Sequence, residues 1–159
     1  MNRLSKYAAA IGLMFGLAAA PAEAANFKTL KPLITGAPSV TATVSIGQQT
    51  MVLQVVDEKG AARTYMWHVS TGKRGYATPT GEYGPTWLSP NHWSKKYRAP
   101  MPYAVFFHGG YAIHATDAVR RLGQPASHGC VRLAKDNAAM FFKLVAEYGK
   151  SNTKIVITD

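Results

Sequence analysis

Short runs of alternating or apolar residues, separated by turn residues, dominate the chain after residue 39. The stretches 40–46 (VTATVSI), 50–56 (TMVLQVV) and 63–69 (RTYMWHV) are rich in β-branched and aromatic residues. Such runs are typical of strands, and the turn 57–60 (DEKG) indicates that the second and third run antiparallel. The pattern therefore predicts an antiparallel meander in the first half of the domain.

The second half of the chain predicts a hairpin, a helix and a final strand. Residues 104–115 (AVFFHGGYAIHA) are two apolar runs about a Gly-Gly turn. Residues 135–148 place apolar side chains on one helical stripe, and Gly149 is a typical helix stop. Residues 153–158 (TKIVIT) have the composition of a strand. Residues 135–148 are the only segment of the chain whose periodicity indicates a long helix.

The region between residues 70 and 102 is rich in Gly and Pro and is long for a loop of a compact domain. Loops of this size are functional or disordered, and the aromatic residues here argue against disorder. We therefore expect a long loop that covers a site. Together these patterns predict a mainly β fold, a compact β-sandwich or barrel-like domain over residues 40–159 with one main helix in its C-terminal half.

The N-terminal residues predict export. Arg3 and Lys6 precede an uncharged Ala/Leu-rich run that ends at a small-x-small site, Ala22-Glu23-Ala24. These features define a signal peptide over residues 1–24, and the apolar run is shorter than a spanning helix needs. Residues 25–39 lack periodicity and are interpreted as a flexible leader. We therefore expect a mature protein in the periplasm or cell wall, with no stable membrane insertion.

The chain is strongly basic, with a formal net charge of +10 that falls to +9 without Arg3, Lys6 and Glu23. Such a charge favours anionic partners and says nothing about fold. Outside the cytoplasm these are anionic wall polymers, acidic peptide stems or lipid headgroups. Nucleic acid is not indicated, because no basic helix, zinc-finger spacing or stacking motif is present.

The chain has a single cysteine, Cys130, in the stretch 125–133 (PASHGCVRL). In an oxidising compartment an unpaired cysteine forms an intermolecular disulfide, is a reactive thiol, or is buried and inert. A reactive thiol needs a base or a positive field, because little of a free thiol is ionised at neutral pH. Gly129 permits a tight turn just before Cys130, where peptide amides can converge on an oxyanion.

Two histidines are candidates for the base. His128 precedes the cysteine by two residues, and His114 arrives from the predicted hairpin, as partners in cysteine hydrolases commonly do. A rigid strand would hold the His114 ring and leave the adjacent carbonyl of Ala115 free to orient its other nitrogen. The residues alone favour His114 only mildly over His128.

The segment 111–133 (YAIHATDAVRRLGQPASHGCVRL) resembles the catalytic signature of the YkuD-type L,D-transpeptidases, cysteine enzymes that remodel peptidoglycan. The stretch 71–85 (TGKRGYATPTGEYGP) resembles the upstream loop of the same family. The resemblance extends over residues 40–159 and implies the fold of that catalytic domain. Many relatives have Gly where this chain has Ala115. A backbone carbonyl can still orient the histidine after this change, but a positive φ at this position would be disfavoured.

The resemblance implies a role for each matching residue. Cys130 becomes the nucleophile, His114 the general base and Ala115 the carbonyl that orients it. The amides of Gly129 and Cys130, with His128, would form the oxyanion hole, and Ser127 and His128 would shape the loop. Substrate-binding candidates are Arg132, Tyr83 and Trp87, but Arg132 could equally buttress the loop, and the two aromatics could simply pack it.

The implied reaction is acyl transfer. The Cys130 thiolate attacks the carbonyl of the third residue of a tetrapeptide stem and releases D-Ala, and an amine of a second stem or a lipoprotein resolves the thioester. The family also implies acylation by carbapenem-type inhibitors, and it requires neither cofactor nor metal. A hydrolytic relative, either an L,D-carboxypeptidase or a peptidoglycan-lipoprotein link hydrolase, is the first alternative.

Two further alternatives come from other classes of protein. A non-catalytic basic wall-binding module would need only the charge, and its wall retention would fall with salt. A zinc site formed by His114, His128 and Cys130 has poor support, because the short-range ligand pairs of zinc proteins are missing.

Overall fold

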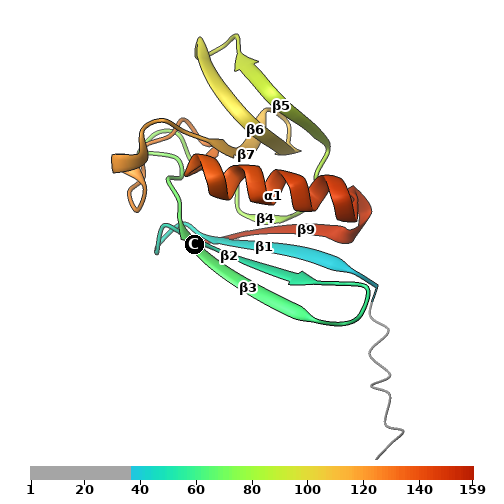
Figure 1. The fold of residues 1–159 in the computed structure, drawn as a ribbon. Helices are drawn as coiled ribbons and strands as arrows, with labels where there is room; N and C mark the ends of the chain where they lie inside the picture. Colours follow the sequence, from blue (N-terminus) through green and yellow to red (C-terminus); the bar gives the residue numbers. More distant parts are fainter. Residues whose placement is uncertain (1–36) are drawn as a thin grey trace, which may run out of the picture. The chain divides into compact units, whose positions relative to one another are not determined.

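The computed structural model describes residues 37–159, and the predicted signal peptide and most of the leader lie outside them. The strands form two open sheets (Figure 1). The five-stranded sheet has the order β3-β2-β1-β9-β4, with bounds β1 Ser39–Ser45, β2 Thr50–Val56, β3 Ala62–His68, β4 Gly81–Tyr83 and β9 Thr153–Thr158. The four-stranded sheet has the order β5-β6-β7-β8, with bounds β5 Trp87–Ser94, β6 Ala99–His108, β7 Tyr111–Ala115 and β8 Val131–Leu133. The mainly β prediction is confirmed, and neither sheet closes into a barrel.

The predicted meander, hairpin, helix and final strand are all present. β1, β2 and β3 pair antiparallel in sequence order, and β6 and β7 pair about the Gly109-Gly110 turn. The final strand β9 pairs parallel with β1, which places the C-terminal strand inside its sheet, between β1 and β4. The described part of the chain also contains two short 3₁₀ segments, η2 Val119–Arg121 and η3 Lys150–Asn152.

Helix α1, Lys135–Tyr148, lies between the two sheets (Figure 1) and contacts β6 and β7 on one side and β1 on the other. Its buried positions Ala138, Phe141 and Val145 follow the apolar stripe of the sequence. Alternate residues of β1, β2 and β9 are also fully buried in this core. Because each large apolar side chain buried there stabilises the fold by about 1.5–3 kcal/mol, this core fixes the helix and both sheets around it.

The region 70–102 is not the continuous loop that its composition predicts. It contains β4 and the eight-residue strand β5, which pairs antiparallel with β6 from Trp87–Phe106 to Ser94–Ala99. Prolines are tolerated because β5 is an edge strand and β7 pairs with β6 only from Val105 onward. The long hairpin β5–β6, together with the loop before it, therefore takes the place of the expected loop.

Candidate active site

The two residues central to the predicted chemistry lie on neighbouring strands of the four-stranded sheet. β7 carries His114, and Cys130 directly precedes β8, which pairs parallel with β7. The register aligns Ile113 with Val131, and both are buried in the core. Because side chains alternate along a strand, His114 and Cys130 project from the opposite face. Residues 16 positions apart in the sequence thus meet on one surface of the sheet.

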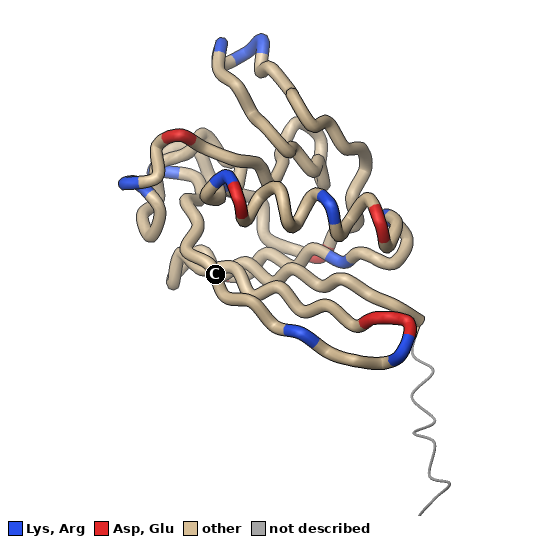
Figure 2. Tube along the Cα trace, viewed as in Figure 1, with Lys and Arg blue, Asp and Glu red and all other residues tan. Residues whose placement is uncertain are grey.

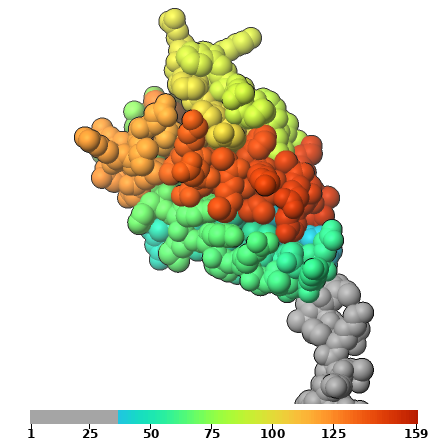
Figure 3. All heavy atoms as spheres, in the orientation of Figure 1, coloured from blue at the N-terminus to red at the C-terminus, as the bar shows by residue number. Residues whose placement is uncertain are grey.

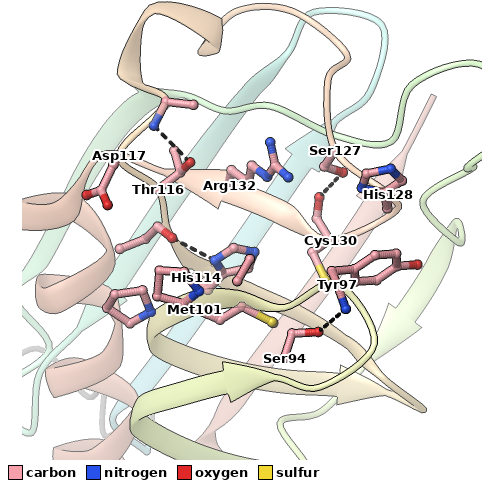
Figure 4. Close-up of a pocket in the computed structure, with 15 residues that line it drawn as sticks. Ser94, Tyr97, Met101, His114, Thr116, Asp117, Ser127, His128, Cys130 and Arg132 are labelled. Carbon is pink, nitrogen blue, oxygen red and sulfur yellow. Dashed lines mark hydrogen bonds between the residues drawn. The ribbon is translucent and has the colours of Figure 1, made fainter.

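This surface forms the floor of a pocket of about 270 Å³ (Figure 4). Six of the predicted site residues line it: His114, Ala115, Ser127, His128, Cys130 and Arg132. Six residues at the free end of the hairpin β5–β6 form another wall: Ser94, Tyr97, Ala99, Pro100, Met101 and Pro102. In Figure 3 the hairpin rises above the segment that follows β7. The hairpin end, and not an irregular loop, therefore borders the site.

The His114 ring is oriented by a backbone hydrogen bond. Its Nδ1 lies 2.6 Å from the Ala115 carbonyl oxygen, and because a carbonyl only accepts, Nδ1 carries the proton. The other ring nitrogen, Nε2, is then a free acceptor, and it faces Cys130 in Figure 4. Ala115 lies in β7 without a positive φ, so alanine at this position introduces no backbone strain.

Burial sets the protonation states of both groups. Desolvation lowers the pKa of His114 to about 4; the Ala115 hydrogen bond acts in the opposite direction, and the charge of Arg132 lowers the pKa further. Burial also raises the pKa of the Cys130 thiol, which the Ala112 amide and Arg132 partly offset. At neutral pH the resting pair is therefore a neutral imidazole and a neutral thiol, which suits general-base activation.

The turn before Cys130 is held by internal hydrogen bonds. The Ser127 hydroxyl donates to the Cys130 carbonyl and accepts from the Gly129 amide, with 2.9 Å between the Gly129 nitrogen and the hydroxyl oxygen. The Gly129 amide is therefore already engaged within the turn, and its expected role as an oxyanion donor stays a prediction. The amides of His128 and Cys130 remain as the proposed donors.

Gly129 is required by conformation and by space. Its φ is +112°, and a Cβ there would lie 2.4 Å from Cε1 of Tyr111. A positive φ of this kind is rare for residues with a side chain, and the aromatic ring leaves no room. The tight turn expected from the sequence is present, and it packs against the Tyr111 ring.

Replacing Gly129 with alanine is expected to lower the free energy of unfolding by at least about 2 kcal/mol, because backbone strain and overpacking both contribute. Urea denaturation measures this change. Gly84→Ala is the matched control, since a Cβ at Gly84 meets nothing within 4 Å and its φ is not in the strained region. Equal stability of the two variants would contradict the assigned role of Gly129.

A second segment, residues 71–78, is hydrogen-bonded to the loop that contains Cys130. The Thr71 carbonyl accepts from the amides of Ala126 and Ser127 at 3.0 and 2.9 Å. The buried Thr78 hydroxyl accepts from the Gly72 amide at 2.9 Å and donates to the Gly129 carbonyl at 2.8 Å. The upstream loop is thus a structural partner of the cysteine loop.

Several residues at the site were not singled out from the sequence. Gln49 is buried in the β1–β2 turn and makes two hydrogen bonds to Thr71. Tyr97 lines the pocket and stacks on His128, with 4.7 Å between the ring centres. No local pattern marks Gln49 or Thr78, since their partners are distant in sequence. Tyr97 could have been suspected only as one of several aromatics in the 70–102 region.

Two predicted substrate-binding residues lie outside this pocket, and their assignment stays a prediction. Tyr83, on β4, packs against Phe107 and His108 and donates its hydroxyl to the Thr80 carbonyl. Trp87, on β5, stacks flat on Phe106 at 4.1 Å. Neither lines the pocket that contains Cys130. Of the two interpretations left open for them, packing is the one the contacts support.

Arg132 makes contacts that bear on both of the roles left open for it. Its backbone pairs with Ser70, with hydrogen bonds of 2.9 and 3.1 Å that tie β8 to the segment after β3. Its guanidinium lines the pocket and makes one weak hydrogen bond, 3.5 Å to the Ala126 carbonyl. The charged end is therefore available to an anionic ligand.

Within residues 37–159, no group of three His, Cys, Asp or Glu side chains is arranged to hold a metal ion. No helix in the same part of the chain is long and apolar enough to cross a membrane.

Comparisons with known proteins agree with this geometry. A family model described as the L,D-transpeptidase catalytic domain, YkuD, matches residues 39–157. The chain is 30% identical over 111 residues to "Probable L,D-transpeptidase YbiS" of Escherichia coli K12, covering 55% of this chain and 36% of that protein. The matched region therefore spans about a third of that relative's length.

Solved structures show the same fold. An L,D-transpeptidase from Mycobacterium smegmatis superposes with a TM-score of 0.65 at 22% identity, covering 77% of this chain and 59% of the other. L,D-transpeptidase 3 from Mycobacterium tuberculosis, solved with a faropenem-derived adduct, gives 0.63 at 21% identity, covering 77% and 61%. These matches are similarities of fold.

Proposed function

The chain belongs to the YkuD family of L,D-transpeptidase catalytic domains, and from this membership we propose that it modifies peptidoglycan by acyl transfer through Cys130. The observation that carries the proposal is the pocket in which a lone thiol and a histidine locked by a backbone carbonyl project from one face of the sheet. A nucleophile beside an oriented base is the arrangement that covalent catalysis requires.

In the first half-reaction, Nε2 of His114 takes the thiol proton as Sγ attacks the carbonyl of the third residue of a tetrapeptide stem. The C–N bond to the terminal D-Ala breaks, and His114 returns the proton to the leaving amine. A thioester on Cys130 remains. The amides of His128 and Cys130 would donate to the oxyanion, and Arg132 would hold a stem carboxylate at the pocket wall.

In the second half-reaction, an amine from a second stem or a lipoprotein attacks the thioester. His114 accepts the amine proton, the C–S bond breaks, and the thiol is restored. Water in place of the amine gives an L,D-carboxypeptidase by the same route. Cys130 and His114 have the same roles in transpeptidation and in hydrolysis, so the two reactions are distinguished by their products.

The test is mass spectrometry of products after the protein is mixed with purified disaccharide-tetrapeptide. Loss of D-Ala with formation of a cross-linked dimer supports transpeptidation. Loss of D-Ala with trimmed monomers alone favours hydrolysis. No release of D-Ala by a folded, reduced protein would contradict the tetrapeptide as donor. Wall retention that falls with salt and is unchanged in Cys130→Ala would then support a binding module.

The location of the protein is part of the same proposal. The predicted signal peptide at residues 1–24 and leader lie before the domain, whose first strand begins at Ser39. We infer export to the periplasm or cell wall, where stem peptides are found.

The activity is expected to persist to unusually low pH for a histidine-dependent reaction. Because burial lowers the pKa of His114 to about 4, the base stays neutral at pH 5, and kcat/KM should fall by half only near pH 4. D-Ala release measured from pH 3.5 to 8 checks this. A midpoint near 6.5 would contradict it.

Circular dichroism at each pH separates loss of the base from unfolding. The unfolded chain binds the His114 proton with the ordinary pKa, so it holds more protons than the folded chain between pH 6.5 and 4. The free energy of unfolding therefore decreases as the pH falls through this range.

A carbapenem is expected to acylate Cys130. Attack of Sγ on the β-lactam carbonyl breaks the ring C–N bond, and the nitrogen stays attached, so the protein should gain the full mass of the inhibitor. Intact-protein mass spectrometry measures this gain, and Cys130→Ala is the control. A mass gain in the variant, or none in the folded, reduced wild type, would contradict the assignment.

A further inference from the structure

Two tyrosines and two lysines surround the His128 ring beside the pocket. Tyr97 stacks on the ring at 4.7 Å, and Tyr76 meets it edge-on at 4.5 Å. The Lys96 ammonium lies 5.2 Å from the centre of the Tyr97 ring, and the Lys73 ammonium lies 5.2 Å from that of Tyr76. Cation–π contacts therefore hold each lysine one ring away from His128. We call Lys73 and Lys96 the lysine pair.

The lysine pair comes from two segments that the fold brings together. The Lys73 amide donates to the Ser127 carbonyl at 3.0 Å, which fixes this residue beside the cysteine loop. Lys96 lies at the free end of the hairpin β5–β6, where Figure 2 shows a cluster of basic residues. The Tyr97 amide donates to the Ser94 hydroxyl and closes that turn. Both lysines thus sit on backbone that is anchored at the site.

The lysine pair has no acidic partner of its own. Within residues 37–159 the one ion pair is Lys154 with Glu82, on the other sheet. Asp117 is the only acidic side chain that lines the pocket, where Arg132 adds a further positive charge. Burial, followed by the charges of Lys73, Arg132 and Lys96, lowers the pKa of His128, which agrees with their closeness. The rim of the pocket is therefore a site of uncompensated positive charge.

We propose that the lysine pair is a carboxylate-binding subsite that selects donors with a free carboxylate in addition to the one on the terminal D-Ala. The inference rests on the proposed function for its peptide donor. Neither lysine lines the pocket with Cys130 and His114, so the bound carboxylate belongs to a part of the stem away from the scissile bond. The subsite contributes to substrate affinity and selection.

The test is a binding measurement that needs no turnover. The Cys130→Ala protein is titrated with two synthetic tetrapeptides that differ only in one carboxylate outside the terminal residue, replaced in the second peptide by a carboxamide. The acidic peptide is expected to bind about three- to tenfold more tightly, the range for two solvent-exposed ion pairs. The preference should shrink as salt is raised.

Variants then locate the preference. Adding Lys73→Met and Lys96→Met is expected to lower affinity for the acidic peptide to that for the carboxamide. The control adds Lys59→Met and Lys143→Met, two exposed lysines outside the pocket, which remove the same charge and should keep the preference. Equal binding of the two peptides, no binding of either, a preference that survives loss of the lysine pair, or equal loss in the control would each overturn the proposal.

The wild-type protein separates this inference from the proposed function. A salt-sensitive preference that depends on the lysine pair, found together with no D-Ala release, would support the subsite and contradict acyl transfer. D-Ala release at equal kcat/KM from both peptides would support acyl transfer and overturn the subsite.

Discussion

Replacing Cys130 with alanine is expected to lower the rate of D-Ala release from a tetrapeptide donor by at least about 10⁴-fold, because the variant has no atom that can form the thioester. The loss should appear in kcat and leave donor binding nearly unchanged. D-Ala release under saturating donor, coupled to a D-amino acid assay, measures it.

Folding of the variant is expected to be nearly unchanged. Cys130 is partly buried against a small cluster that includes Met101 and Phe106, and its thiol makes one long contact, 3.9 Å to the Gly110 carbonyl. Loss of so few contacts should cost about 1 kcal/mol or less. Retained turnover in a variant with a native circular dichroism spectrum would remove Cys130 from the mechanism.

Replacing His114 with glutamine is expected to lower kcat/KM by about 10²- to 10⁴-fold, the contribution of a positioned general base. Glutamine is polar and of similar size, so it can still donate to the Ala115 carbonyl, but it cannot take the thiol proton. Steady-state rates of D-Ala release for the two proteins measure the loss.

The pH dependence separates a base from a structural residue. Without His114 the reaction depends on free thiolate, and the rate should rise about tenfold per pH unit until the thiol ionises. The wild type should be nearly flat between pH 6 and 8, since its base is already neutral. A variant that loses activity but keeps this flat profile would show that His114 has only a structural role.

Much of the fold could be predicted because local pattern and tertiary environment agree. Strand β1 alternates cleanly in sequence, and β1 and β2 both bury every second residue in the core that also contains α1. The helix begins and ends within the predicted range, with Gly149 at its end in a positive-φ conformation. Where one face of an element meets the core, the periodicity of its apolar residues is informative.

Strand β5 could not be predicted, because its sequence is dominated by residues typical of loops. It forms because β6 offers an unpaired edge, and Pro90 falls between the paired residues Ser89 and Asn91. The place of Trp87 could not be predicted for the same reason, since a residue expected on a site-covering loop lies on this strand and stacks on Phe106. Pairing between strands is a tertiary event that short-range patterns do not record.

The candidate site divides in the same way. Cys130, His114 and Arg132 could be named from the sequence as candidates that line one pocket, because the block SHGCVR with a preceding histidine is a specific pattern. The supports supplied by Thr78 and Tyr97 could not, since each acts on a residue at least 31 positions away, as the partners Gly129 and His128 show. The engaged amide of Gly129 likewise depends on the rotamer of Ser127, which no sequence pattern specifies.

The most direct test of the acyl-transfer account is intact-protein mass spectrometry after rapid acid quench of a single turnover, with protein in excess over disaccharide-tetrapeptide. The account predicts a transient mass gain equal to the donor minus D-Ala, mapped by proteolysis to Cys130. D-Ala release without such an adduct, or an adduct on another residue, would contradict it.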